Sequence, residues 1–160
     1  MGVTGSGKTT VGQALAARLG WKFTDADDFH SAANVRKMSQ GTPLDDADRA
    51  PWLAALREAI LQWMREHRSV VIACSALKRS YREQLCLSEE VKMVYLRGSF
   101  ELIRERLRSR CEHFATEAIL ASQFAAVEEP GEGEALLVSI DQKPAEIANE
   151  IVAKLGIVNS

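Results

Sequence analysis

The sequence predicts a single α/β domain over residues 1–160, with a parallel sheet flanked by helices. Two observations predict it. A glycine-rich segment at residues 2–9 leads directly into a helical pattern, and short apolar runs alternate with helical stretches along the rest of the chain. Right-handed crossovers in such a chain give a doubly wound sheet, with the ligand crevice at the carboxyl ends of the strands.

The glycine-rich segment matches the pattern G-x-x-x-x-G-K-[ST] in full. Its glycines let backbone N–H groups turn inward and form a nest for phosphate oxygens at the start of the following helix. Lys8 is then expected to bridge the terminal phosphates, and the Thr9 hydroxyl to reach Mg²⁺. The predicted nucleotide-binding residues of this segment are Gly2, Val3, Thr4, Gly5, Ser6, Gly7, Lys8, Thr9 and Thr10.

The elements follow in chain order. A helix is expected over residues 10–19, with Gly20 as its C-terminal stop, and later helices are expected to begin at Pro51, after Ser99 and at Pro144. Continuous apolar runs predict buried parallel strands at residues 21–25, 70–74, 91–96 and 136–140. Only Met1 precedes the glycine-rich segment, which normally follows a buried strand, so we expect the first strand to be missing or truncated.

The composition argues against nucleic acid and membranes as binding partners. The chain is 46% hydrophobic and 26% charged, with a net charge of −2, so it offers no basic field for nucleic acid and no polybasic stretch for an anionic membrane. It shows no transmembrane run and no signal peptide, and we expect a cytoplasmic protein. The three cysteines lack C-x-x-C spacing, which argues against a zinc site or a disulfide framework.

Two aspartates stand at the end of the expected 21–25 strand. Asp25 and Asp27 are two residues apart, so in an extended chain both carboxylates would lie on one side, roughly 7 Å apart. One could hold a Mg²⁺-bound water, and the other could orient a substrate hydroxyl. The competing interpretation is that Asp27 and Asp28 simply cap the following turn.

Two arginines share a helix face. Arg106 and Arg110 lie one turn apart, and we expect them to belong to a mobile lid over approximately residues 106–126 that clamps the phosphates. The alternative is a solvated basic face, because Arg104 and Arg108 lie in the same helix.

Further runs give the chain a more specific resemblance. They are Asp25-Ala26-Asp27-Asp28-Phe29-His30, Asn34, Lys37-Met38, Gly41-Thr42-Pro43-Leu44, Asp46, Asp48-Arg49, Pro51-Trp52-Leu53, Ala73-Cys74-Ser75-Ala76-Leu77-Lys78, Tyr81-Arg82, Arg106, Arg110, His113-Phe114 and Ser122-Gln123-Phe124. In this order and over nearly the whole chain, the sequence resembles the small gluconokinases.

The resemblance implies a P-loop fold of the nucleoside-monophosphate-kinase type, a homodimer, and transfer of phosphate from ATP, with Mg²⁺, to the 6-hydroxyl of D-gluconate. It implies three catalytic residues, Lys8, Asp27 and Arg110, with Arg106 and Arg110 also contacting the nucleotide. Thr9 and Asp25 are the implied metal residues. The implied acceptor-binding residues are Asp27, His30, Arg49, Lys78, Arg82 and Gln123, with Gln123 either contacting the acceptor or supporting the lid.

The sequence departs from the family pattern in three places. Glu112 and Ala115-Thr116 replace the usual glycine and proline around the lid histidine, and Ser31 stands where proline often follows His30. No aspartate ends the 70–74 strand, so Asp25 has to take over the magnesium role. Two alternatives therefore stay open: a kinase of another small hydroxy acid such as shikimate, and a nucleotide-binding protein without turnover.

Overall fold

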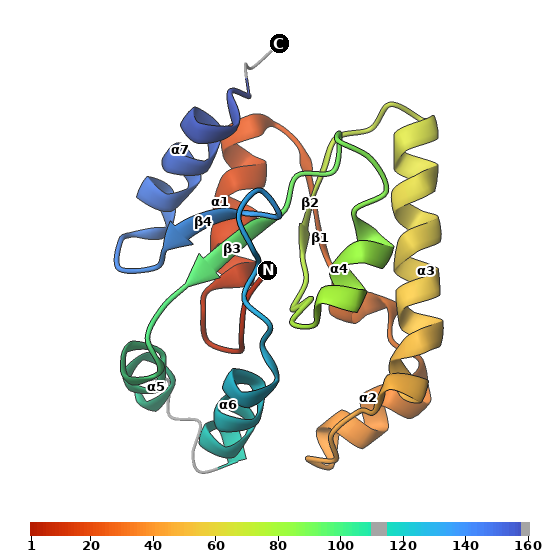
Figure 1. Cartoon of the computed structure of the whole chain (residues 1–160), viewed down its shortest axis with the longest axis vertical. Helices are drawn as coiled ribbons and strands as arrows, with labels where there is room; N and C mark the ends of the chain where they lie inside the picture. The colour runs from red at the N-terminus through yellow and green to blue at the C-terminus, as the bar shows by residue number, and fades with distance from the viewer. Residues whose placement is uncertain (110–114, 158–160) are drawn as a thin grey trace.

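The structure is a computed structural model and describes residues 1–109 and 115–157. Its strands form two parallel pairs (Figure 1). Strand β1 (Lys22–Asp25) pairs with β2 (Val70–Ala73), and β3 (Val94–Arg97) pairs with β4 (Leu136–Ser139). The expected α/β architecture with parallel strands is confirmed.

The two pairs are joined by the first residues of the chain. The Leu96 N–H donates to the Met1 carbonyl at 3.0 Å, and the Gly2 N–H donates to the Ser75 carbonyl at 3.3 Å. In space the order is therefore β1, β2, Met1–Gly2, β3 and β4. We expected the first strand to be missing or truncated. At its position, between the two strand pairs, lie the two residues Met1 and Gly2, which lead directly into the phosphate loop.

The helices of the described residues surround these strands (Figure 1). They are α1 (Lys8–Leu19), the 3₁₀ helix η1 (Ala26–Phe29), α2 (Ala32–Ser39), α3 (Asp46–Arg65), α4 (Arg79–Leu85), α5 (Phe100–Arg108), α6 (Ala115–Ala126) and α7 (Pro144–Leu155). Helix α1 packs against α7, β1 and β2, while α3 packs against α4. Helices α5 and α6 lie at the same end of the molecule as α2, on the opposite side of the phosphate loop.

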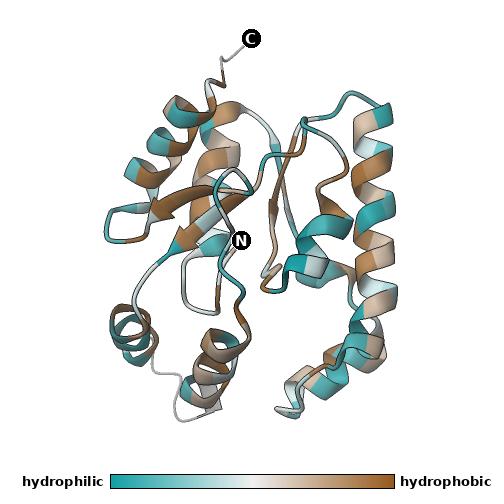
Figure 2. Cartoon of the chain, in the orientation of Figure 1, coloured by the Kyte–Doolittle hydropathy of each residue, from teal (hydrophilic) through white to brown (hydrophobic). Residues whose placement is uncertain are grey.

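Apolar side chains form two buried clusters. One joins α1, α5 and α7 to the β3–β4 pair, with Ile103, Ile140 and Ile147 almost completely buried. The other lies among α3, α4 and β2, with Leu56 completely buried. In Figure 2 brown, apolar residues dominate β4, and on α3 they alternate with polar ones, as expected for a helix with one buried face.

Several expected boundaries are observed. Ser99 caps α5 by accepting the Leu102 N–H at 3.2 Å, and α7 begins at Pro144. The helix expected from Pro51 instead begins at Asp46, because Asp45 and Asp48 form a reciprocal capping box upstream of the proline. Among the described helices, none is long and apolar enough to span a bilayer.

Candidate active site

The glycine-rich segment forms a compact loop that ends in helix α1. Gly5 and Gly7 have φ angles of +74° and +92°, in the left-handed region that favours glycine. A β-carbon on Gly5 would lie 2.8 Å from the Leu107 side chain, so α5 packs directly against the loop. A β-carbon on Gly7 would meet only Val11, at 3.9 Å, and the loop leads into the first turn of α1, a helix N-terminus of the kind that suits anions.

Lys8 lies over this loop. Its Nζ donates to the Val3 carbonyl at 2.9 Å, and the Ser6 N–H donates to the same oxygen at 3.2 Å. Burial lowers the pKa of Lys8, although the carboxylates of Asp27 and Asp25 act in the opposite direction. Val3 itself is buried in the core, and Thr10 is exposed on the first turn of α1.

The carboxyl end of β1 lies beside the start of α1. The Thr9 hydroxyl donates to Asp25 Oδ2 at 3.3 Å, and Asp25 Oδ1 accepts the Asp27 N–H at 3.1 Å. Asp25 thus caps η1, the role that the competing interpretation gave to its neighbours. The chain leaves the strand at Asp25, so the extended-chain geometry expected between Asp25 and Asp27 is wrong, and a capped turn brings the two together instead.

Asp27 faces solvent with 77% of its side chain exposed. The surrounding protein partly desolvates the carboxylate and so raises the pKa of Asp27, and the negative charge of Asp25 raises it further. Its carboxylate is 3.9 Å from His30 Nε2. This arrangement leaves Asp27 accessible to a ligand that lies over the phosphate loop.

The donor set fits ATP with Mg²⁺. The loop amides and Lys8 suit phosphate oxygens, and the paired hydroxyl and carboxylate of Thr9 and Asp25 suit a hard cation. In the described part of the chain, no group of three or more His, Cys, Asp or Glu residues is close enough to hold a metal. A magnesium ion here would therefore complete its shell with phosphate oxygens and water.

His30 is fixed by stacking. Its ring lies parallel to that of Trp52, with centroids 4.8 Å apart, and only 6% of its side chain is exposed. Trp52 is held in turn by its indole N–H, which donates to the Ala26 carbonyl at 2.6 Å. Burial lowers the pKa of His30, so its imidazole is neutral at pH 7.

Lys78, which immediately precedes α4, and Arg49, in the first turn of α3, both lie over the Tyr81 ring. Lys78 Nζ lies 2.7 and 2.8 Å from the two oxygens of Asp46, and the Tyr81 hydroxyl donates to Asp46 as well. The Arg49 guanidinium lies over the Tyr81 ring, 5.9 Å from its centroid. A polar cluster with two cations thus joins the start of α3 to the start of α4.

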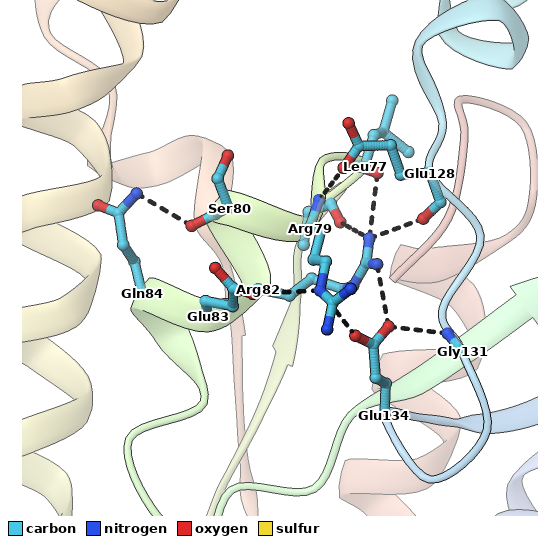
Figure 3. A network of polar contacts seen from close by, with 10 residues as sticks. Leu77, Arg79, Ser80, Arg82, Glu83, Gln84, Glu128, Gly131 and Glu134 are labelled. Atoms are coloured by element: carbon cyan, nitrogen blue, oxygen red, sulfur yellow. Dashed lines mark hydrogen bonds and ion pairs between the residues drawn. The ribbon is translucent and has the colours of Figure 1, made fainter.

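Arg82 is buried, with 5% of its side chain exposed (Figure 3). Its guanidinium donates to the carbonyls of Leu77 at 3.1 Å and Glu128 at 2.8 Å, and it forms an ion pair with Glu134 at 3.3 Å. The family resemblance implied that Arg82 binds the acceptor. In the structure its guanidinium is occupied by main-chain carbonyls and Glu134.

Gln123 and Arg106 come from the expected lid region. Gln123 Oε1 accepts the Thr4 N–H at 2.6 Å, and the Arg106 guanidinium donates to the Ile140 carbonyl at 2.6 Å. Arg110, expected to be catalytic and to contact the nucleotide, lies outside the described residues, as does Glu112.

The structure thus brings together Lys8, Thr9, Asp25, Asp27 and His30 around the phosphate loop, with Arg49 and Lys78 in a neighbouring cluster. Sequence reasoning did not single out the side chains that hold these residues in place. Asp46, Trp52 and Tyr81 all appear in the runs that carry the family resemblance. That resemblance was the available signal for them, since neither spacing nor periodicity distinguishes a supporting residue from a surface one.

Comparison with known proteins shows which family this chain is similar to. The model of the family described as "Shikimate kinase" matches residues 4–155. A protein named "Probable gluconokinase" from Xenopus tropicalis is 43% identical, in an alignment covering 100% of this chain and 95% of that protein. The "Gluconokinase" of Gluconobacter oxydans (strain 621H) is 44% identical over 95% of this chain and 86% of its own length.

The chain belongs to the gluconokinase family. A solved structure agrees: the crystal structure of a gluconokinase from Sinorhizobium meliloti 1021 superposes with a TM-score of 0.86 at 43% identity, over 98% of this chain and 89% of that one. The family resemblance stated from the sequence is confirmed, and with it the P-loop kinase fold.

Proposed function

We propose that this protein is a gluconokinase that transfers the γ-phosphate of ATP to the 6-hydroxyl of D-gluconate, giving 6-phospho-D-gluconate and ADP. The observation that carries the proposal is the near full-length similarity, at 43 and 44% identity, to proteins named as gluconokinases. The phosphate loop with an accessible carboxylate beside it is the geometry that such a reaction needs.

The nucleotide is proposed to bind with its phosphates on the loop amides of residues 2–9 and Lys8 against the terminal phosphates. Mg²⁺ bound near Thr9 and Asp25 would neutralise charge on the transferring group. We propose that Arg106 contacts the nucleotide from α5, and that Arg110 stabilises the charge that develops on the transferring phosphoryl group.

On the acceptor side, Asp27 is proposed to hold the reacting hydroxyl and accept its proton. Its accessible carboxylate, close to Lys8, supports this role. A sugar acid also needs hydrogen-bond donors and at least one cation for its carboxylate. We propose Arg49 and Lys78 as those cations, with His30 as a neutral donor. We propose that Arg82 and Gln123 support the site without contacting the acceptor, because Arg82 bonds the Leu77 carbonyl and Gln123 bonds the Thr4 N–H.

We also propose that the metal is magnesium, that the protein is a homodimer and that it is located in the cytoplasm. Magnesium as the metal is testable by activity after chelation and re-addition of single divalent cations. A homodimer is testable by light scattering of the eluting protein. A cytoplasmic location is testable by fractionation of the source cells.

The experiment that tests the function is ADP release from purified protein with ATP and Mg²⁺, across D-gluconate, other sugar acids and shikimate, with a blank lacking acceptor. Shikimate belongs in the panel because the matching family model carries that description. Strong dependence on gluconate is expected. Preference for shikimate would support the second kinase hypothesis, and ATP binding without acceptor-dependent ADP would support the non-catalytic one.

A further inference from the structure

We propose that Gln123 positions Lys8: its side chain fixes the Val3–Thr4 peptide, and the carbonyl of that same peptide holds the lysine ammonium. Gln123 then acts on the phosphate loop from helix α6, in place of the acceptor contact that the family resemblance suggested for it. The kinetic consequence rests on the proposed kinase function, whereas the structural consequence does not.

A single peptide unit, Val3–Thr4, links Gln123 to Lys8. Its N–H, from Thr4, donates to Gln123 Oε1 at 2.6 Å. Its C=O, from Val3, accepts from Lys8 Nζ at 2.9 Å and from the Ser6 N–H at 3.2 Å. The peptide is trans, so its N–H and C=O point in opposite directions. A side chain that holds the N–H on one side therefore fixes the direction of the carbonyl toward Lys8 on the other.

Gln123 can do this because α6 is itself fixed against α5. Leu120, one turn earlier, is completely buried, and the Phe124 ring meets Phe100 of α5 edge to face with centroids 5.3 Å apart. Glu117 adds ion pairs to Arg104 and Arg108 at 3.8 and 3.3 Å. The side chain of Gln123 is half-buried between this packed face and the loop.

The segment after α6 is anchored independently. The Glu128 N–H donates to the Leu77 carbonyl at 2.9 Å, and the Glu128 carbonyl accepts from Arg82 at 2.8 Å. The Glu128 carboxylate also accepts the Arg79 N–H at 2.5 Å (Figure 3). Because the buried Arg82 guanidinium fastens this segment to the start of α4, α6 is held both along its face and beyond its end. Gln123 is thus presented to the loop from a fixed support.

The consequence is specific. Without an acceptor at position 123, the Thr4 N–H loses its partner, and the Val3–Thr4 peptide is held only on its carbonyl side, by the Ser6 N–H, so its plane can tilt. Lys8 then loses a fixed direction toward the terminal phosphates. A loss of positioning of this kind lowers kcat, and we expect a fall of about tenfold, with the KM for gluconate within about twofold of wild type.

The test measures the Thr4 amide directly, in protein without ligand, by hydrogen exchange in NMR spectra of ¹⁵N-labelled samples. Gln123→Leu keeps the size of the side chain and removes the acceptor, so Thr4 is expected to exchange about tenfold faster. Gln123→Glu replaces the amide oxygen with a carboxylate oxygen and so keeps an acceptor for the Thr4 N–H. Protection of that N–H is expected within about threefold of wild type. Gln84→Leu is the matched control, because Gln84 is exposed on α4 and bonds the Ser80 carbonyl of its own helix.

The outcomes separate the hypotheses. Unchanged Thr4 exchange in Gln123→Leu overturns the proposal, and so does a raised gluconate KM at unchanged kcat, since that pattern belongs to an acceptor contact. If the leucine variant does not fold, Gln123→Asn, whose side chain is one methylene shorter, makes the same comparison. Wild-type protein without gluconate-dependent turnover would remove the proposed function but leave the exchange result interpretable.

Discussion

The Thr9 hydroxyl lies 3.3 Å from the Asp25 carboxylate, so the first turn of α1 and the end of β1 share one hydrogen bond. Asp25 also accepts the Asp27 N–H, which holds the start of η1 beside the phosphate loop. One carboxylate thereby joins the candidate metal position, at Thr9, to the candidate base, Asp27.

Replacing the loop lysine removes the cation that faces the terminal phosphates. Lys8→Ala is expected to lower gluconate-dependent ADP release by at least about 100-fold, because Lys8 is the one positively charged side chain of residues 2–9. Its circular dichroism spectrum and melting temperature are expected to stay close to wild type, since the Lys8 side chain bonds a loop carbonyl and contributes little to the core. Activity within a few-fold of wild type would rule out the phosphate-loop assignment.

Asp27 should affect chemistry more than nucleotide binding. Asp27→Asn keeps the shape of the side chain and removes its ability to accept the hydroxyl proton, so kcat is expected to fall by about 100-fold or more. The Kd for ATP, measured by calorimetry, is expected to change far less. Equal losses in both quantities would reassign Asp27 to the metal or the nucleotide.

The acid side of the pH profile reports on the same carboxylate. The surrounding protein and Asp25 raise the pKa of Asp27, so the proton that inactivates it binds at a higher pH than for a free carboxyl group. Activity should therefore fall with decreasing pH through this raised pKa. Asp28 also raises it, so Asp28→Asn should move the acid limb of kcat/KM to lower pH. A limb that stays in place, or moves to higher pH, would show that another group controls it.

Lys78 is expected to serve the acceptor carboxylate. Lys78→Met should raise the KM for gluconate roughly tenfold or more, with the KM for ATP nearly unchanged, because a charged hydrogen bond to the acceptor is lost. Lys37→Met is the matched control: Lys37 makes a comparable ion pair, 2.6 Å from Asp48, on α2. Similar changes in both variants would mean that Lys78 acts only by holding Asp46 at the start of α3.

Local signals in the sequence predicted much of the fold. The phosphate loop, the Ser99 cap and the proline at the start of α7 depend on residues adjacent in the chain, and each was observed at its expected place. Helix α2 and the early start of α3 were missed. The start of α2 depends on the Ser31 cap and that of α3 on the Asp45–Asp48 capping box, and both lie within a polar stretch that carries little apolar periodicity.

The candidate site shows the same division. Residue types and spacing identified Lys8, Thr9 and Asp25, whose partners are close in sequence or lie at a strand end. The burial of Arg82 and the contact between Gln123 and Thr4 join segments far apart in the chain. No pattern in one sequence reveals such a contact, because it depends on how α4 and α6 pack against the rest of the fold.

The central claim is most directly tested by identifying the product. Purified protein, ATP, Mg²⁺ and D-gluconate should yield a phosphorylated sugar acid whose ³¹P NMR signal couples to the protons on carbon 6, in amounts equal to the ADP formed. ADP that forms equally without gluconate, or a phosphate on a different carbon, would contradict the account.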